Sequence, residues 1–185
     1  AMEAIRDSDH FNTPLEKAGA DGKLRGRGMA SGYWNGGGNK STVTINVNDD
    51  GLVSLIEGNP DIGGTRTTIA MQAAEVLGIP AENVHPSVAD TDSIGYNDLT
   101  AGSRTTMASG TAAIAAARLI VEEMKLRVAM IWETEADNVD FTDGVFTNRV
   151  APDQTLAFQK AASQLGTTGG PVAKTGTVNV RGSGG

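Results

Sequence analysis

The chain has 185 residues, a formal net charge of −7 and no cysteine. Without cysteine, this sequence can form no disulfide, no cysteine-bound zinc site and no cysteine-ligated iron–sulfur cluster. The acidic balance and a single short basic run argue against a nucleic-acid surface, and no apolar run approaches the ~20 residues that cross a bilayer. We therefore expect no nucleic-acid partner and no membrane partner. Because the polar N-terminus does not look like a signal peptide, we also expect a cytoplasmic protein.

Small residues dominate the composition. Hydrophobic residues make up 39% of the chain and aromatic residues 4%, so the core must consist mainly of Ala, Val, Ile, Leu and Met. The 24 glycines exceed the usual share of about 7%. This excess predicts many tight loops, or many places where the backbone approaches a ligand closely.

The first half of the chain predicts strands followed by a helix. Residues 25–34 have a weak strand pattern, and residues 42–47 alternate cleanly between polar and apolar side chains. An Asn-Asp-Asp-Gly turn then predicts a hairpin with a return strand over residues 52–57. The pattern becomes helical over residues 65–77, which a glycine and a proline follow. Residues 84–88 predict a short strand that contains a proline and therefore lies at an edge.

The second half predicts a long helix over about residues 103–130, with an Ala-rich centre that lets other backbone pack closely against it. A second hairpin is expected over residues 139–146, turning at Asp-Gly. Residues 152–165 predict a helix with an acidic residue near its start and a glycine past its end. Residues 178–180 look like a strand without a partner in this chain.

Together these elements predict an α+β fold, with a mixed sheet containing hairpins packed against two or three helices. We expect residues 1–166 to form one lobe. Residues 167–185 are expected to be a glycine-rich tail or the start of a second lobe that lies outside this sequence.

One short phrase occurs twice, each time after a loop of small residues and before a helical pattern. The copies read Gly64-Thr65-Arg66-Thr67-Thr68 and Gly102-Ser103-Arg104-Thr105-Thr106. A helix start presents free backbone N–H groups, and here each start also carries hydroxyls and one arginine, which suits a phosphate or another anion. We expect the two starts to lie close together and to share one anion. The alternative is a tight strand-to-helix turn with an ordinary threonine cap, repeated by coincidence.

Other candidate motifs are weaker. Asp90-Thr91-Asp92 could be part of a magnesium site or an ordinary turn, and His10 and His85 have no partner at metal-ligand spacing. The sequence has no nucleophile elbow and no phosphate-binding or dinucleotide-binding glycine motif. We therefore assign no catalytic residue and no metal ligand.

The two loops and their flanks resemble the molybdopterin-binding large subunit of the xanthine dehydrogenase and aldehyde oxidase family. The resemblance rests on residues 58–80, with Asp61-Ile62-Gly63-Gly64, and on residues 90–104, with Thr100-Ala101-Gly102-Ser103-Arg104. It implies that both loops line the cofactor and contact its pterin and phosphate. The residues implied are Ile62, Gly63, Gly64, Thr65, Arg66, Thr100, Ala101, Gly102, Ser103, Arg104 and Thr105.

The resemblance also implies an activity and partners for the parent protein. Members of this family use molybdenum, held by the molybdopterin, to hydroxylate N-heterocycles or to oxidise aldehydes. Their electrons leave through iron–sulfur clusters, usually to a flavin. We therefore expect the partners to be the rest of the large subunit, the iron–sulfur and flavin subunits or domains, and a small-molecule substrate.

This sequence departs from the family pattern in two places. Many members carry a glutamine between the glycines of the first loop, whereas Gly63 is followed directly by Gly64 here. The family's catalytic glutamate lies in a Gly-Glu context, and no Gly-Glu pair occurs in these 185 residues. We therefore expect a piece of the subunit that is inactive and holds no molybdenum by itself. The alternatives are a stand-alone, non-enzymatic module that binds a phosphorylated small molecule, or a structural fragment without a ligand.

Overall fold

The structure, a computed structural model, describes residues 2–16, 18–30, 32–34 and 36–181. The chain divides into two compact units, residues 1–34 and residues 35–185. The first unit contains two short helices, α1 (Met2–Arg6) and α2 (Asp9–Asn12). The second unit contains all other elements: β1 (Asn39–Val47), β2 (Val53–Glu57), α3 (Thr65–Leu77), η1 (Ala81–Asn83), β3 (Val84–Val88), α4 (Thr105–Trp132), η2 (Ala136–Asn138), β4 (Val139–Thr142), β5 (Val145–Asn148), β6 (Thr155–Ala157), α5 (Phe158–Ala162), η3 (Leu165–Thr167) and β7 (Val172–Val180).

A mixed four-stranded sheet in the order β3-β2-β1-β7 forms the base of the second unit. Strand β1 pairs antiparallel with β2 and with β7, while β2 and β3 pair in parallel and are connected through α3. Strand β3 lies at an edge of the sheet, as its proline predicts. The expected α+β fold with a mixed sheet is confirmed.

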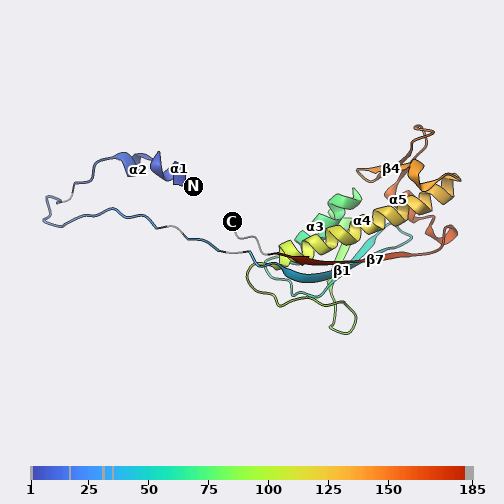
Figure 1. The fold of residues 1–185 in the computed structure, drawn as a ribbon, viewed down its shortest axis with the longest axis horizontal. Coiled ribbons are helices and arrows are strands. Elements are labelled where there is room, and N and C mark those ends of the chain that lie inside the picture. Colours follow the sequence, from blue (N-terminus) through green and yellow to red (C-terminus); the bar gives the residue numbers. More distant parts are fainter. Residues whose placement is uncertain (1, 17, 31, 35, 182–185) are drawn as a thin grey trace. The chain divides into compact units, whose positions relative to one another are not determined.

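Helices α3 and α4 cover one face of this sheet and lie against each other (Figure 1). The alternation within β1 and β2 explains this arrangement, because every second side chain over residues 43–47 and 53–55 is apolar and fully buried. The sheet contributes Val43, Ile45, Val47, Val53 and Leu55 to the core. The helices contribute mainly alanines, with larger residues such as Ile69, Leu77, Ile120 and Met124 between them. The described helices include none long and apolar enough to cross a membrane.

The alanines of α4 permit the close backbone packing that the sequence predicts. A Cβ atom added at Gly176 of β7 would collide with the Ala112 carbonyl oxygen and the Ala116 nitrogen of α4. A Cβ added at Gly110 of α4 would collide with the Gln72 side chain of α3. The Gln72 side chain can move away, whereas the backbone atoms at Gly176 cannot, so Gly176 is the glycine that lets β7 approach α4 closely.

A small antiparallel sheet in the order β4-β5-β6 lies beside the C-terminal part of α4 (Figure 1). The expected hairpin between β4 and β5 is confirmed, and both of its turn residues, Asp143 and Gly144, have positive φ. The helix predicted over residues 152–165 is only partly correct. Thr155–Ala157 pairs with β5 instead, and the helical part is confined to Phe158–Ala162. Pairing along the free edge of β5 outweighs the helical pattern here.

Two further expectations differ from the structure. The strand expected over residues 25–34 is absent from the described part of that range, where most residues are exposed and no neighbouring strand pairs with them. Residues 178–180 do have a partner, because β7 pairs with β1 along its whole length. The segment expected to begin a tail at residue 167 therefore contains an outer strand of the main sheet.

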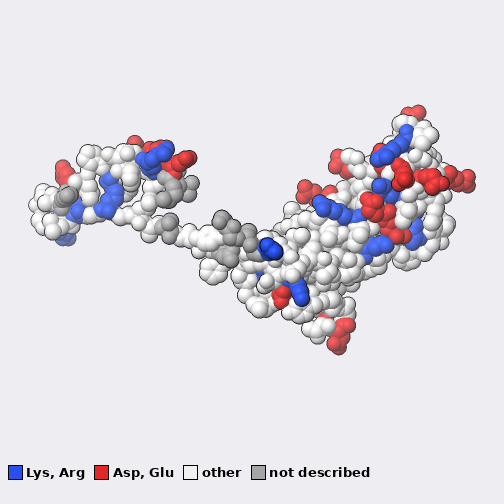
Figure 2. All heavy atoms as spheres, viewed as in Figure 1, with Lys and Arg blue, Asp and Glu red and all other residues white. Residues whose placement is uncertain are grey.

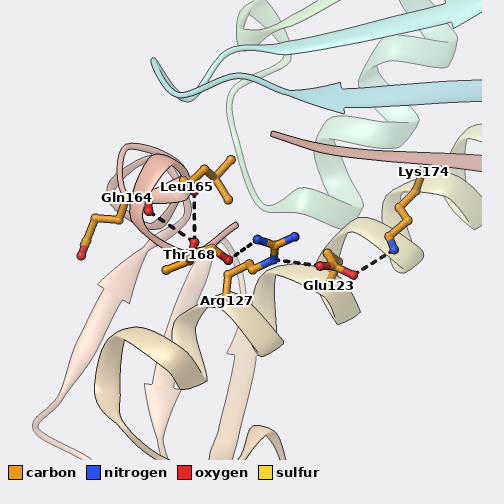
Figure 3. A network of polar contacts seen from close by, with 6 residues as sticks. All are labelled: Glu123, Arg127, Gln164, Leu165, Thr168 and Lys174. Carbon is orange, nitrogen blue, oxygen red and sulfur yellow. Dashed lines mark hydrogen bonds and ion pairs between the residues drawn. The ribbon is translucent and has the colours of Figure 1, made fainter. Parts of the chain in front are cut away.

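A polar network fastens the segment before β7 to α4 (Figure 3). Glu123 accepts hydrogen bonds from Arg127 at 2.8 Å and from Lys174 of β7 at 2.9 Å. Arg127 also donates to the Thr168 carbonyl oxygen. The two cations hold the pKa of Glu123 below its usual value, chiefly through the Lys174 hydrogen bond and then the Arg127 hydrogen bond.

Candidate functional site

The two loops predicted to bind an anion meet at one pocket of about 360 Å³. Its lining residues come from the start of α3, from the loop before α4 and from the first turn of α4: Ile62, Thr65, Thr100, Ala101, Ser103, Arg104, Thr105 and Thr106. The expected proximity of the two helix starts is confirmed, since Thr65 and Ser103 line the same space. The volume lies near the lower end of the ~300–1,000 Å³ typical of small-molecule pockets.

The remaining predicted residues lie outside this pocket lining: Gly63, Gly64, Arg66 and Gly102. The three glycines have φ angles of +63°, +78° and +61°, so they turn the chain into each helix. Ser103 also has a positive φ, +54°, although it carries a side chain. Each loop thus reaches its helix through two successive left-handed residues.

The repeated phrase is used differently at its two positions. Helix α3 begins at Thr65, directly after the left-handed Gly64, whereas α4 begins two positions later in the phrase, at Thr105. The ordinary threonine cap of the alternative interpretation does not form at α3. Gly64 occupies the N-cap position, and the Thr65 hydroxyl accepts a hydrogen bond from the Ile62 amide at 3.2 Å. The similar sequences of the two copies therefore do not produce equivalent helix starts.

Protein atoms already occupy much of the start of α3. The Arg66 amide donates to Asp61 Oδ1 at 3.1 Å, and the Arg66 guanidinium lies 3.4 Å from Asp61 Oδ2. The Thr65 amide donates to the Ile62 carbonyl at 3.3 Å. Asp61 thus accepts from the donors at this helix start, and Arg66 lies outside the pocket lining.

Arg104, in contrast, contributes to the pocket lining although it is only 2% exposed. Its guanidinium donates to backbone and side-chain oxygens at distances of 2.6 to 3.5 Å, namely the carbonyls of Gly38, Lys40, Asp98 and Leu99, with Ser41 Oγ and Asn59 Oδ1. These contacts engage all five N–H groups of the side chain, so none remains to donate to a ligand. The expected direct contact between this guanidinium and the cofactor is therefore not available in this conformation.

The positive charge of Arg104 nevertheless acts on the pocket. None of the ion pairs among the described residues includes Arg104, so no carboxylate within ion-pair distance neutralises its charge. Burial lowers its pKa, while the more distant Asp98 and Tyr96 raise it. A guanidinium remains charged in proteins even so. A buried cation next to a pocket favours an anionic occupant.

The start of α4 supplies unoccupied donors. Within the described part of the chain, the backbone amides of Thr105, Thr106 and Met107 have no protein acceptor. The Thr105 side chain is 4% exposed, and its hydroxyl oxygen is buried without a hydrogen-bond partner. The N-terminal end of this 28-residue helix also carries the positive end of the helix dipole. Thr105 and Thr106, with their unpaired amides, and the buried cation Arg104 therefore line the same pocket.

Thr106 lines the pocket although sequence reasoning did not include it in the site. Its position in the first turn of α4 was the available signal, but the boundary of that helix was expected two residues earlier. The overall charge offers less guidance, because acidic and basic side chains are intermixed on the face of residues 35–185 drawn in Figure 2. The unpaired amides at the start of α4 and the charge of Arg104, rather than a basic surface, make this pocket suitable for an anion.

The acidic loop before the pocket behaves as a turn. Asp90 Oδ1 accepts a hydrogen bond from the Asp92 amide at 3.0 Å, the pattern of an Asx turn. Hydrogen bonds from Ser93 and Asp92 lower the pKa of Asp90. No group of three or more potential metal-ligating acidic or histidine side chains occurs in the described ranges. Of the two interpretations of this loop, the geometry supports turn chemistry.

Comparison with known proteins matches this chain to one family. The family model described as "Molybdopterin cofactor-binding domain" matches residues 3–183. The 6-hydroxypseudooxynicotine dehydrogenase complex subunit gamma of Paenarthrobacter nicotinovorans is 29% identical over 84% of this chain and 21% of its own length. The nicotine 6-hydroxylase large subunit of the same organism is 30% identical over 56% of this chain and 13% of its own length.

Solved structures show the same fold. A Cu,Mo-CO dehydrogenase matches with a TM-score of 0.70 and 22% identity, over 80% of this chain and 20% of that protein's chain. Quinoline 2-oxidoreductase from Pseudomonas putida 86 matches with a TM-score of 0.64 and 21% identity, over 76% and 19%. The chain thus spans about a fifth of the length of these proteins. It belongs to the molybdopterin cofactor-binding domain family of the xanthine dehydrogenase, CO dehydrogenase and aldehyde oxidoreductase large subunits and covers part of that domain.

Proposed function

We propose that this chain forms one wall of the molybdopterin pocket in a molybdenum hydroxylase, where the start of α4 binds the phosphate of the cofactor. The observation that carries this proposal is the buried, unpartnered hydroxyl of Thr105, next to three free amides and a cation without a carboxylate partner. A buried polar atom without a partner is costly, and an anion that accepts from it removes that cost.

The residues present fit the phosphate end of such a cofactor. The amides of Thr105, Thr106 and Met107 and the hydroxyls of Ser103 and Thr105 would hold the phosphate, and Arg104 would balance its charge from below. The bound cofactor supplies two-electron redox chemistry through its metal. The chain's own part is to orient the anionic group, to exclude water from it and to hold the helix dipole toward it. Membership of the family favours this ligand over another phosphorylated molecule.

The names of the related proteins suggest a substrate class for the parent. Nicotine 6-hydroxylase and quinoline 2-oxidoreductase are both named for aromatic N-heterocycles. We propose that the parent of this chain hydroxylates an N-heterocycle, with aldehyde oxidation as the second possibility. Two relatives are named as subunits, one of them of a complex. Iron–sulfur and flavin partners, inactivity of this chain alone and a cytoplasmic location stay predictions.

Inorganic phosphate tests the site directly. The ¹⁵N-labelled chain is titrated with sodium phosphate at constant ionic strength, and amide chemical shifts are followed by NMR. We expect saturable shifts at residues 105–107 and a loss of affinity in Thr105→Val, which removes the hydroxyl but keeps the shape. Thr67→Val is the matched control, because Thr67 holds the same place in the other copy of the phrase and is exposed. Unsaturable shifts, or equal losses in the two variants, would contradict the proposal.

A further inference from the structure

A buried polar network lies directly behind the pocket, and Asn59 is at its centre. Asn59 is 2% exposed and lies at the beginning of the loop between β2 and α3. Its Oδ1 accepts hydrogen bonds from the Thr100 hydroxyl at 3.0 Å and from Arg104 Nη1 at 3.3 Å. Its Nδ2 donates to Ser109 Oγ at 2.7 Å and to Asn97 Oδ1 at 3.4 Å.

These four contacts use the full hydrogen-bonding capacity of the amide group. They extend to the loop before α4 and to the second turn of α4 itself, so one side chain joins both segments that shape the pocket. None of the pocket-lining residues between 62 and 65 makes a comparable contact with the other loop in the described structure. Asn59 is not a lining residue, so its effect on a ligand has to pass through Thr100 and Arg104.

The backbone of Asn59 is fixed as firmly as its side chain. Its amide donates to Glu57 Oε2 at 2.9 Å, and the Glu57 side chain is fully buried at the end of β2. Glu57 Oε1 is buried without a partner. Burial raises the pKa of Glu57, and the nearby charges of Asp61 and Arg66 act on it in opposite directions. The loop therefore leaves the sheet at a point that cannot shift without disturbing the core.

We propose that Asn59 is a positioning residue: it locks the loop of residues 97–104 against α4 and so determines the shape of the anion pocket without contacting the ligand. The part of this inference that concerns ligand affinity rests on the proposed function. The coupling between Asn59 and the loop does not, because it follows from the hydrogen bonds alone.

Asn148 provides a matched control for a purely structural role. It is also buried, at 6% exposure, and its Nδ2 donates to Gln154 Oε1 at 2.7 Å. It belongs to the β4-β5-β6 sheet and does not line the pocket. Asn59→Ala and Asn148→Ala each remove a buried amide, but only Asn59→Ala removes a link to the loop of residues 97–104.

The test is hydrogen exchange followed by mass spectrometry on the wild type and both alanine variants. Two described backbone amides hydrogen-bond at this loop: the Asp98 amide donates to the Lys40 carbonyl at 3.1 Å, and the Gly37 amide donates to the Gly102 carbonyl at 2.5 Å. We expect exchange of these two amides to accelerate in Asn59→Ala by about tenfold beyond any global change, the factor for one net hydrogen bond. In Asn148→Ala only residues 139–157 should show such an effect. Thr100→Val, which removes one of the four contacts, should give a smaller acceleration and keeps the test open if Asn59→Ala does not fold.

Equal protection of the Asp98 and Gly37 amides in the wild type and all these variants would overturn the inference. The phosphate titration separates the two proposals. If the wild type does not bind phosphate but the loop still depends on Asn59, the proposed function fails and the positioning role stands. If the wild type binds phosphate and Asn59→Ala binds it equally well, the positioning role fails and the proposed function stands.

Discussion

Replacing Arg104 with lysine measures how much the hydrogen bonds of this side chain contribute to the free energy of unfolding. Arginine engages five N–H donors here, and lysine has only three. At least two of the hydrogen bonds to the charged group are then lost, and each contributes about 1.5–3 kcal/mol. We expect Arg104→Lys to lower the free energy of unfolding by about 3–6 kcal/mol, a large part of the ~5–15 kcal/mol of a typical domain.

Arg66→Lys is the control, because Arg66 occupies the same position in the other copy of the repeated phrase. Its guanidinium is 43% exposed and makes one ion pair of 3.4 Å. An exposed pair of this kind contributes little, so we expect a change below about 0.5 kcal/mol. Urea unfolding of both variants, followed by far-UV circular dichroism, gives the midpoint and the slope of each transition.

The expected result is a urea midpoint for Arg104→Lys that lies well below that of Arg66→Lys, with equal slopes. This result would show that the Arg104 hydrogen bonds hold the loop, β1 and α4 together. If both variants unfold at the same urea concentration as the wild type, Arg104 does not hold the loop, β1 and α4 together. Arg104 would then not determine the shape of the pocket.

Three further changes test other parts of the structure. Burial raises the pKa of Glu57 in the folded state above its unfolded value. Glu57 therefore makes its full contribution to the free energy of unfolding below the unfolded pKa of ~4.3, and this contribution is lost as the pH rises through the folded pKa. Glu57→Gln should therefore gain in urea midpoint relative to the wild type between pH 4 and pH 8, and a constant difference would refute this. The pKa of Glu123 is lowered in the folded state, so Glu123 contributes to the free energy of unfolding above its unfolded pKa. This contribution is lost as the pH falls through the folded pKa. Glu123→Gln should cost about 1–3 kcal/mol at pH 7 and much less at pH 3, as measured by the same assay. Gly176→Ala should lower the free energy of unfolding by about 1–3 kcal/mol or more, because the added Cβ collides with α4. Gly166→Ala is the control and should not lower it, because no atom lies within 4 Å of the added Cβ. Similar melting temperatures for the two variants would contradict this prediction.

Much of the fold could be predicted from local patterns. The alternation over residues 42–47 and the helical pattern over residues 65–77 predict elements that the structure contains, because one face of each must be buried. The same reasoning fails over residues 155–157, where it predicts a helix, and it misses the partner of the strand at residues 178–180. Those segments are strands because a neighbouring strand, distant in the sequence in the case of β1 and β7, offers a free edge. A local pattern carries no information about such an edge.

The candidate site shows the same division. The sequence by itself determined that two hydroxyl-rich helix starts follow glycine loops, since glycine tolerates positive φ and helix starts have unpaired amides. Only the tertiary structure decided that Asp61 fills one start and that the other stays open. It also decided that one arginine of the repeated phrase is exposed while Arg104 is buried among carbonyl oxygens. The physical reason is that burial and hydrogen-bond partners depend on which segments pack together, and identical neighbours in sequence can pack against entirely different atoms.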